Sequence, residues 1–291
     1  MSKEQNLTDR PTDALTDKNL VKQIKGIKNL LVILTCIVLV GGLGAGACGW
    51  KLYKKVKNDE ASIQNLTLQI NTLKTNQQAA SFDNSIFTDS TYNYLAIGNS
   101  ITYHDAMSYW WNQGVGMAAS DADHDYVHVL SSMLGDGTVV GSMNFYDWEA
   151  QSYDRGETLS TLNSYLSPNL NLVTIQLGEN AKDTSTFEED FEDLINYVKS
   201  KSPKAEIVVI GEFWKNEEKD NDKKKACETT DTTFVDLSSM WDDPSYEAGM
   251  GTTVYGSDGK AHTIEHDGVA KHPGDKGMQK IAELTYKAIK K

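Results

Sequence analysis

The chain has 291 residues, of which 39% are hydrophobic and 24% charged, enough for one substantial globular core plus accessory segments. The charge is uneven: residues 1–80 carry 11 Lys and Arg against 6 Asp and Glu, whereas residues 81–291 carry 17 against 35. Binding to nucleic acid depends on cationic side chains that displace counterions from phosphates. The acidic C-terminal part therefore excludes nucleic acid as a partner.

The N-terminal part is organised around one long apolar segment. Residues 1–28 are polar and predict a cytoplasmic tail. The 22 residues from 29 to 50 contain no charge, and about 20 apolar residues span a bilayer as a helix. We predict a transmembrane helix over residues 29–50. Small residues before Cys48 leave lipid attachment at that cysteine open as a second form of anchoring.

A short helical repeat follows the apolar segment. Ile63, Leu66, Ile70 and Leu73 recur at the a/d spacing of a coiled coil. Residues 51–85 are accordingly expected to form a stalk, either a short coiled coil that could make a homo-oligomer or a polar linker. The globular domain is expected over residues 86–291.

Within the C-terminal part, apolar segments typical of strands alternate with amphipathic ones. In chain order they are YNYLAIG, YVHVLSSML, LNLVTIQLG, FEEDFEDLINYVKS, AEIVVIGEFW and TTFVDLS. This alternation predicts an α/β domain with a parallel sheet covered by helices. Helical periodicity also marks residues 187–198 and 275–290, while the polar run 215–225 predicts a solvated loop.

Three segments carry residues suited to acyl-transfer chemistry. A strand runs into Ser100, and the C-terminal ends of strands are where α/β sheets gather catalytic groups. A second strand ends at Asn180, whose amide could donate to an oxyanion or simply cap a turn. His272 precedes the last predicted helix. Because a serine hydroxyl is too weakly acidic to attack unaided, a neutral imidazole must take its proton.

The order of these segments resembles the SGNH/GDSL hydrolase superfamily over roughly residues 92–291. Gly98-Asn99-Ser100 matches the family's G-D-S block with Asn in place of Asp, and Gly178-Glu179-Asn180 matches its G-x-N block. The resemblance implies a three-layer α/β/α, flavodoxin-like domain with a mostly parallel central sheet. It also implies that Ser100 is the nucleophile, that His272 is the base, and that the Ser100 N–H and the Asn180 side chain form an oxyanion hole.

Two positions depart from the family pattern. The glycine that supplies a further oxyanion N–H is missing from residues 143–149, where the backbone N–H of Trp148 or of a neighbouring residue is the candidate donor. The family places the triad acid three residues before the histidine, where Val269 stands. Asp267 is the chosen substitute. Glu265 and Asp275 compete with it, and some family members resemble a dyad whose histidine is oriented by a backbone carbonyl.

The expected substrate is an acetylated carbohydrate or another small ester. We predict that Glu179, Trp111 and Trp214 contact it, because aromatic faces stack on sugar rings, although core packing explains the tryptophans equally well. The resemblance implies a serine esterase, most simply a carbohydrate O-acetylesterase that needs no metal or organic cofactor. With the apolar segment 29–50 as anchor, we expect it at the cell membrane with the catalytic domain outside the cell. A glycan O-acetyltransferase and a noncatalytic surface glycan-binding protein are the alternatives.

Overall fold

The computed structural model describes residues 82–151 and 155–289. The predicted tail, the apolar segment 29–50 and most of the predicted stalk lie outside the described residues. The described part begins with a short 3-10 helix, η1 (Asn84–Ile86), just before the first strand. Among the described residues, no helix is both long and apolar enough to cross a membrane.

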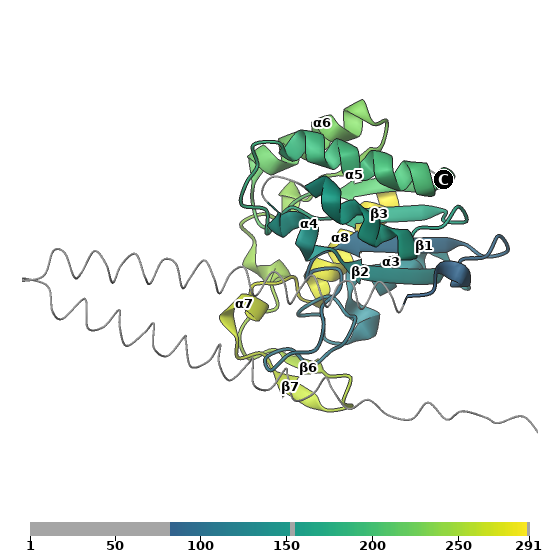
Figure 1. Ribbon diagram of the computed structural model, residues 1–291. Coiled ribbons are helices and arrows are strands. Elements are labelled where there is room, and N and C mark those ends of the chain that lie inside the picture. The colour runs from purple at the N-terminus through teal and green to yellow at the C-terminus, as the bar shows by residue number, and fades with distance from the viewer. Residues whose placement is uncertain (1–81, 152–154, 290–291) are drawn as a thin grey trace, which may run out of the picture. The chain divides into compact units, whose positions relative to one another are not determined.

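The centre of the domain is a five-stranded parallel sheet (Figure 1). Its spatial order is β2-β1-β3-β4-β5, the flavodoxin-like order in which the chain reverses its direction of winding between β1 and β3. The predicted parallel sheet is confirmed. The strands are β1 (Asn93–Gly98), β2 (Val139–Asn144), β3 (Leu172–Gln176), β4 (Glu206–Ile210) and β5 (Thr233–Val235).

Side chains alternate between the two faces of the sheet along each strand. Both faces are buried, as is usual in parallel sheets. In β1, Tyr94 and Ala96 belong to one hydrophobic cluster, and Leu95 and Ile97 to the other. All four side chains are fully buried. A continuous apolar strand such as this one is what a sheet covered on both sides requires.

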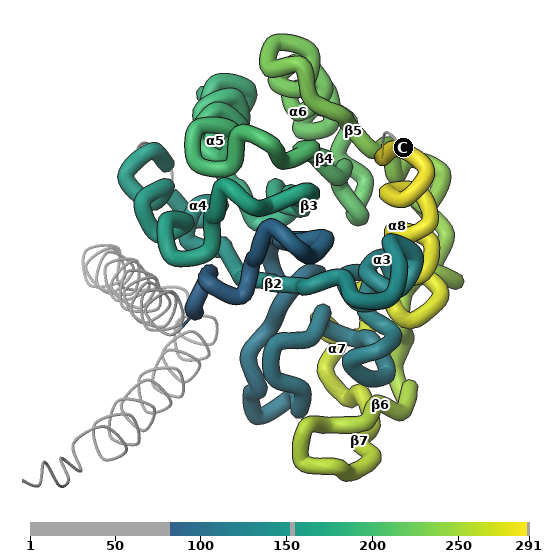
Figure 2. Tube along the Cα trace, turned by 90° about the vertical axis from the view of Figure 1, so that its right-hand side faces the viewer, coloured from purple at the N-terminus to yellow at the C-terminus, as the bar shows by residue number. Residues whose placement is uncertain are grey.

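Helices cover the two faces and complete three layers (Figure 2). The first face is covered by α3 (Tyr126–Leu134) and α8 (Asp275–Ala288). The other face is covered by α4 (Tyr146–Ala150), η3 (Arg155–Ser164), α5 (Phe187–Lys201) and α6 (Glu217–Thr229). The predicted three-layer α/β/α class is confirmed for the described residues.

The prediction of a solvated loop over residues 215–225 is wrong, because most of that run belongs to helix α6. Lys219 and Lys223 are buried there. The Lys219 ammonium donates to the Gly178 carbonyl at 2.6 Å, and the Lys223 ammonium lies 2.7 Å from a carboxylate oxygen of Glu212. Charged side chains can be buried when they are paired, so a helix with one buried side can have a largely polar sequence.

The segment between β5 and α8 brings the C-terminal loop to the sheet. It contains the hairpin strands β6 (Thr253–Tyr255) and β7 (Ala261–Thr263), followed by the short helix α7 (Asp267–Ala270). The remaining elements are 3-10 turns: η2 (Ala122–His124), η4 (Ser238–Met240) and η5 (Pro244–Tyr246).

Candidate active site

Ser100 lies in a tight turn at the C-terminal end of β1. The N–H groups of Thr102 and Tyr103 both donate to the Asn99 carbonyl at 3.0 Å, and the Ser100 carbonyl accepts from Met117 N–H at 2.8 Å. A Cβ atom on Gly98 would collide with the Thr102 side chain, so only glycine permits this close turn. The turn lies beside the end of β3, at the point where the winding of the sheet reverses.

His272 reaches this turn from the loop that follows α7. Its Nε2 lies 2.8 Å from Ser100 Oγ, although 172 residues separate the two in the chain. The loop is held by its own backbone: His272 N–H donates to the Val269 carbonyl at 3.0 Å, and its carbonyl accepts from Ala248 N–H at 2.9 Å. The structure thus brings together the two residues that the sequence paired as nucleophile and base.

The surroundings of His272 determine which of its nitrogens carries the proton. Nδ1 lies 2.7 Å from the Gly268 carbonyl oxygen, which can only accept a hydrogen bond, so Nδ1 is protonated. In the neutral ring, Nε2 then presents its lone pair to the Ser100 hydroxyl. Burial lowers the pKa of His272 to about 4, against the opposing effect of the Gly268 hydrogen bond. The imidazole is therefore neutral and ready to accept a proton at pH 7.

The assignment of Asp267 as the triad acid is wrong. Its carboxylate forms an ion pair with Lys271 Nζ at 2.7 Å, and both side chains are largely exposed. The one-turn helix α7 places the carbonyl of Gly268, rather than a carboxylate, against Nδ1 of His272. The geometry is that of a Ser-His dyad oriented by the main chain.

Trp148 does not provide an oxyanion donor, contrary to the sequence-based assignment. Its N–H already donates to the Phe145 carbonyl at 3.1 Å. The indole is fully buried and packs edge-on against Phe191, with ring centroids 4.9 Å apart. By contrast, the Ser100 N–H has no acceptor in the part of the chain that the structure describes, so it can donate to a developing oxyanion.

Asn180 lies in the turn that follows β3, where its carboxamide Nδ2 donates to Glu149 Oε2 at 2.7 Å. A carboxamide nitrogen has two N–H donors, so this bond leaves one for a ligand. Glu149 comes from α4 and is only 1% exposed. Nothing in the sequence singles out Glu149, since a glutamate in a short, acidic segment carries no signal of burial.

Glu179 was expected to bind substrate, but protein donors occupy both of its carboxylate oxygens. Oε1 accepts from Gln176 Nε2 at 2.7 Å and from Phe213 N–H at 3.1 Å. Oε2 accepts from Asn99 Nδ2 at 2.7 Å. The structure corrects this prediction: Glu179 supports the turn that carries Ser100.

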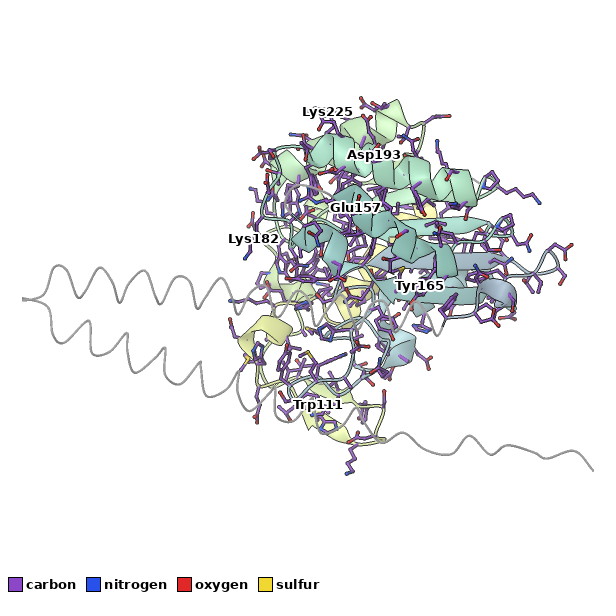
Figure 3. All side chains as sticks on the ribbon, in the orientation of Figure 1. Trp111, Glu157, Tyr165, Lys182, Asp193 and Lys225 are labelled. Carbon is purple, nitrogen blue, oxygen red and sulfur yellow. The ribbon has the colours of Figure 1, made fainter. Side chains whose placement is uncertain are left out.

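The two predicted tryptophans differ in their relation to the dyad. Trp111 stacks on the His262 ring at 4.4 Å, beside the β6–β7 hairpin (Figure 3), so the structure gives it a packing role there. Trp214 stands nearly perpendicular to the His272 ring, with centroids 5.0 Å apart. Its Nε1 donates to the Lys271 carbonyl at 3.1 Å, which fixes the indole beside the base.

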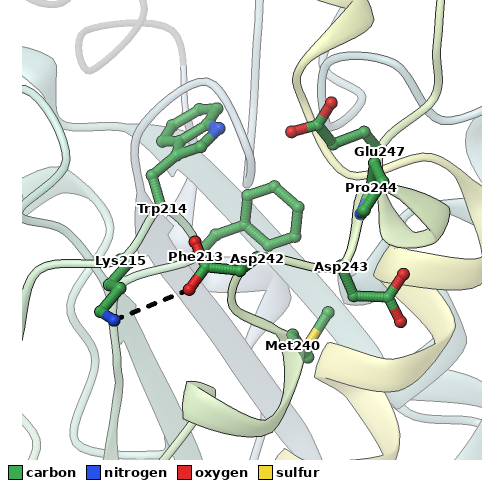
Figure 4. A pocket seen from close by; sticks show the side chains of 8 residues that line it. All are labelled: Phe213, Trp214, Lys215, Met240, Asp242, Asp243, Pro244 and Glu247. Atoms are coloured by element: carbon green, nitrogen blue, oxygen red, sulfur yellow. Dashed lines mark ion pairs between the residues drawn. The ribbon is translucent and has the colours of Figure 1, made fainter.

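Trp214 also forms one wall of a cavity of about 250 Å³ (Figure 4). Phe213 and Met240 contribute further apolar surface, and Lys215 forms an ion pair with Asp242 at 3.6 Å across one side. The other acidic lining residues are Asp243 and Glu247. The cavity thus combines aromatic surface with carboxylates one side chain away from the dyad. No cluster of three or more metal-ligating side chains occurs in residues 82–151 and 155–289.

Comparison with known proteins gives similarities at the level of solved structures. An extracellular lipase from Streptomyces rimosus is 15% identical, with 68% of this chain and 100% of that chain covered and a TM-score of 0.45. A phospholipase A1 from Streptomyces albidoflavus is 12% identical, with 67% and 99% covered and a TM-score of 0.43. A family two carbohydrate esterase from Cellvibrio japonicus is 13% identical, with 67% and 59% covered and a TM-score of 0.41.

No family model matches the chain, and no curated protein sequence matches it.

Proposed function

We propose that the chain is a serine esterase of the SGNH/GDSL type. The observation that carries the proposal is the contact of 2.8 Å between Ser100 Oγ and His272 Nε2. The other ring nitrogen of His272, Nδ1, donates to the Gly268 carbonyl, so Nε2 is free to accept the serine proton. An accessible serine beside a correctly tautomerised, neutral imidazole is the arrangement that nucleophilic ester cleavage requires.

The reaction follows from these two side chains. Ser100 Oγ attacks the ester carbonyl carbon while His272 Nε2 takes the hydroxyl proton. The Ser100 N–H and the remaining Asn180 N–H stabilise the negative charge on the tetrahedral oxygen. The imidazolium then returns its proton to the departing alcohol, which leaves an acyl-Ser100 ester. Water, deprotonated by the same imidazole, hydrolyses this ester to release the acid and restore Ser100.

The proposed substrate is an acetylated carbohydrate. In support, the cavity beside His272 offers the Trp214 and Phe213 rings together with the carboxylates of Asp243 and Glu247. Aromatic surface suits the apolar faces of a sugar, and carboxylates accept hydrogen bonds from its hydroxyl groups. We further propose that residues 29–50 anchor the protein in the cell membrane as a single-pass segment with the catalytic domain outside the cell.

The test is hydrolysis of p-nitrophenyl acetate and release of acetate from acetylated oligosaccharides by the purified protein. Ser100→Ala should lower kcat by at least about 10³-fold without changing the circular dichroism spectrum. Ser132→Ala is the matched control, because that exposed serine on α3 bonds only to the His128 carbonyl in the described structure. Equal turnover by the Ser100 variant and the parent would refute the serine mechanism.

A further inference from the structure

We infer that Glu149 is a positioning residue that connects the nucleophile turn to the turn bearing Asn180 and orients the Asn180 carboxamide toward the oxygen of the substrate's acyl group. This inference rests on the proposed esterase function. Glu149 does not contact Ser100 or His272 through any hydrogen bond in the described structure. It acts through the main chain and side chains at the ends of β1 and β3.

The contacts of Glu149 connect three segments of the chain. Its Oε1 accepts from Gly178 N–H at 2.5 Å, from Asn99 Nδ2 at 3.1 Å and from Asn180 N–H at 3.4 Å. Its Oε2 accepts from Asn180 Nδ2 at 2.7 Å. A 1% exposed carboxylate that accepts four N–H groups is held in one position, and it holds its donors in turn.

Both oxygens of Glu149 must be acceptors. A glutamine of the same shape has one acceptor oxygen and one NH₂ group. If its NH₂ group replaced Oε2, it would face the Asn180 NH₂ group, and if it replaced Oε1, it would face Gly178 N–H. Glu149→Gln therefore removes one of the two acceptor oxygens while the volume of the side chain stays the same. Since a displacement of about 1 Å in a catalytic group can cost about 10²-fold in rate, we expect a large effect from this one-atom change.

Asn99 explains how two carboxylates can be accommodated at this place. Its Nδ2 donates to Glu149 Oε1 at 3.1 Å and to Glu179 Oε2 at 2.7 Å, so the amide lies between them. Its Oδ1 accepts from Ile101 N–H at 3.0 Å and braces the turn. An aspartate at position 99 would bring a third carboxylate against the other two. The SGNH/GDSL pattern has Asp at this position. The Asn found here supplies the N–H donors that the carboxylates of Glu149 and Glu179 accept.

A double-mutant cycle in the full-length protein separates positioning from a general structural role. We expect Glu149→Gln to lower kcat for p-nitrophenyl acetate by about 10- to 100-fold with KM within about 2-fold of the parent. In an Asn180→Ala background, where the oriented amide is already absent, the same change should cost less than about 3-fold. Effects that simply multiply, or a Glu149→Gln variant as active as the parent, would overturn the inference.

Three controls keep the outcomes distinct. Glu157→Gln, an exposed glutamate on η3 (Figure 3), should match the parent. Titration with an organophosphorus ester should show the same fraction of reactive sites in the Glu149 variant and the parent, since a merely misfolded sample would lose sites. If Ser100→Ala fails to abolish turnover, the proposed function itself fails, whereas a normal Ser100 result with an inert Glu149 change refutes this inference alone.

Asn99→Asp supplies a test that does not depend on the folding of the Glu149 variant. The added carboxylate should lower kcat by about 10-fold or more, and Asn99→Asp combined with Glu179→Gln should recover a large part of it. The double variant restores a donor facing an acceptor at the 99–179 contact and keeps the number of carboxylates unchanged. An Asn99→Asp variant with full activity, or the absence of any recovery, would contradict the proposed network.

Discussion

Replacing Asp267 by Asn is expected to leave catalysis almost unchanged. In a triad, the carboxylate that bonds Nδ1 of the histidine holds the reactive tautomer, and its loss costs about 10⁴-fold in kcat, which is about 5 kcal/mol of transition-state stabilisation. Here the Gly268 carbonyl occupies that place at 2.7 Å from Nδ1, and Asp267 instead pairs with Lys271 on the surface. The tautomer should therefore survive the substitution.

The measurement is kcat/KM of Asp267→Asn for p-nitrophenyl acetate at pH 7, with Ser100→Ala as the inactive reference. We expect a change of less than about 3-fold, because only an exposed ion pair is lost. A fall of 10³-fold or more would show that a carboxylate serves the imidazole during turnover, which would refute the dyad geometry.

Two further predictions concern titration and stability. Because burial lowers the pKa of His272 to about 4, kcat/KM should stay level from pH 8 to about pH 5 and fall as the imidazole becomes protonated; an acid limb centred near pH 6.5 would contradict this. Lys223→Met should cost about 3–5 kcal/mol in urea unfolding, since it strips the buried Glu212 of its nearest cation. Lys225→Met, at an exposed position on α6 (Figure 3), is the control, and equal losses would refute the pairing.

The pH dependence of stability has the same origin as that of activity. The folded protein holds His272 neutral down to about pH 4, whereas in the unfolded chain the imidazole binds a proton near the ordinary histidine pKa of 6.5. The unfolded state therefore gains protons first as the pH falls. The contribution of His272 to stability is present above pH 6.5 and is lost progressively between about pH 6.5 and pH 4.

The sequence predicted the sheet and the convergence of its loops because both follow from local patterns. Continuous apolar strands such as β1 and β3 occur in parallel sheets, and their carboxyl ends meet at one edge. Ser100 and Asn180 each follow such a strand, so their proximity could be expected. His272 was recognised from its position before the final helix.

The errors arose where burial or main-chain geometry decides the role. Asp267 was preferred because a carbonyl such as that of Gly268 has no signature in the sequence, and only the turn of α7 shows which group meets Nδ1. Trp148 was proposed as a donor although helix α4 uses its N–H internally. Glu149 and Lys223 were passed over, because charged side chains normally indicate solvent. Glu149 is buried against Gly178, 29 residues along the chain, and Lys223 against Glu212, which precedes helix α6.

The central claim is that Ser100 is a nucleophile activated by His272. It is tested most directly by treating the full-length protein with a fluorophosphonate and locating the adduct by peptide mass spectrometry. One adduct per chain on Ser100, formed far more slowly after His272→Ala, is the predicted result. A protein that turns over acetyl esters but carries no adduct, or carries it on another residue, would contradict the claim.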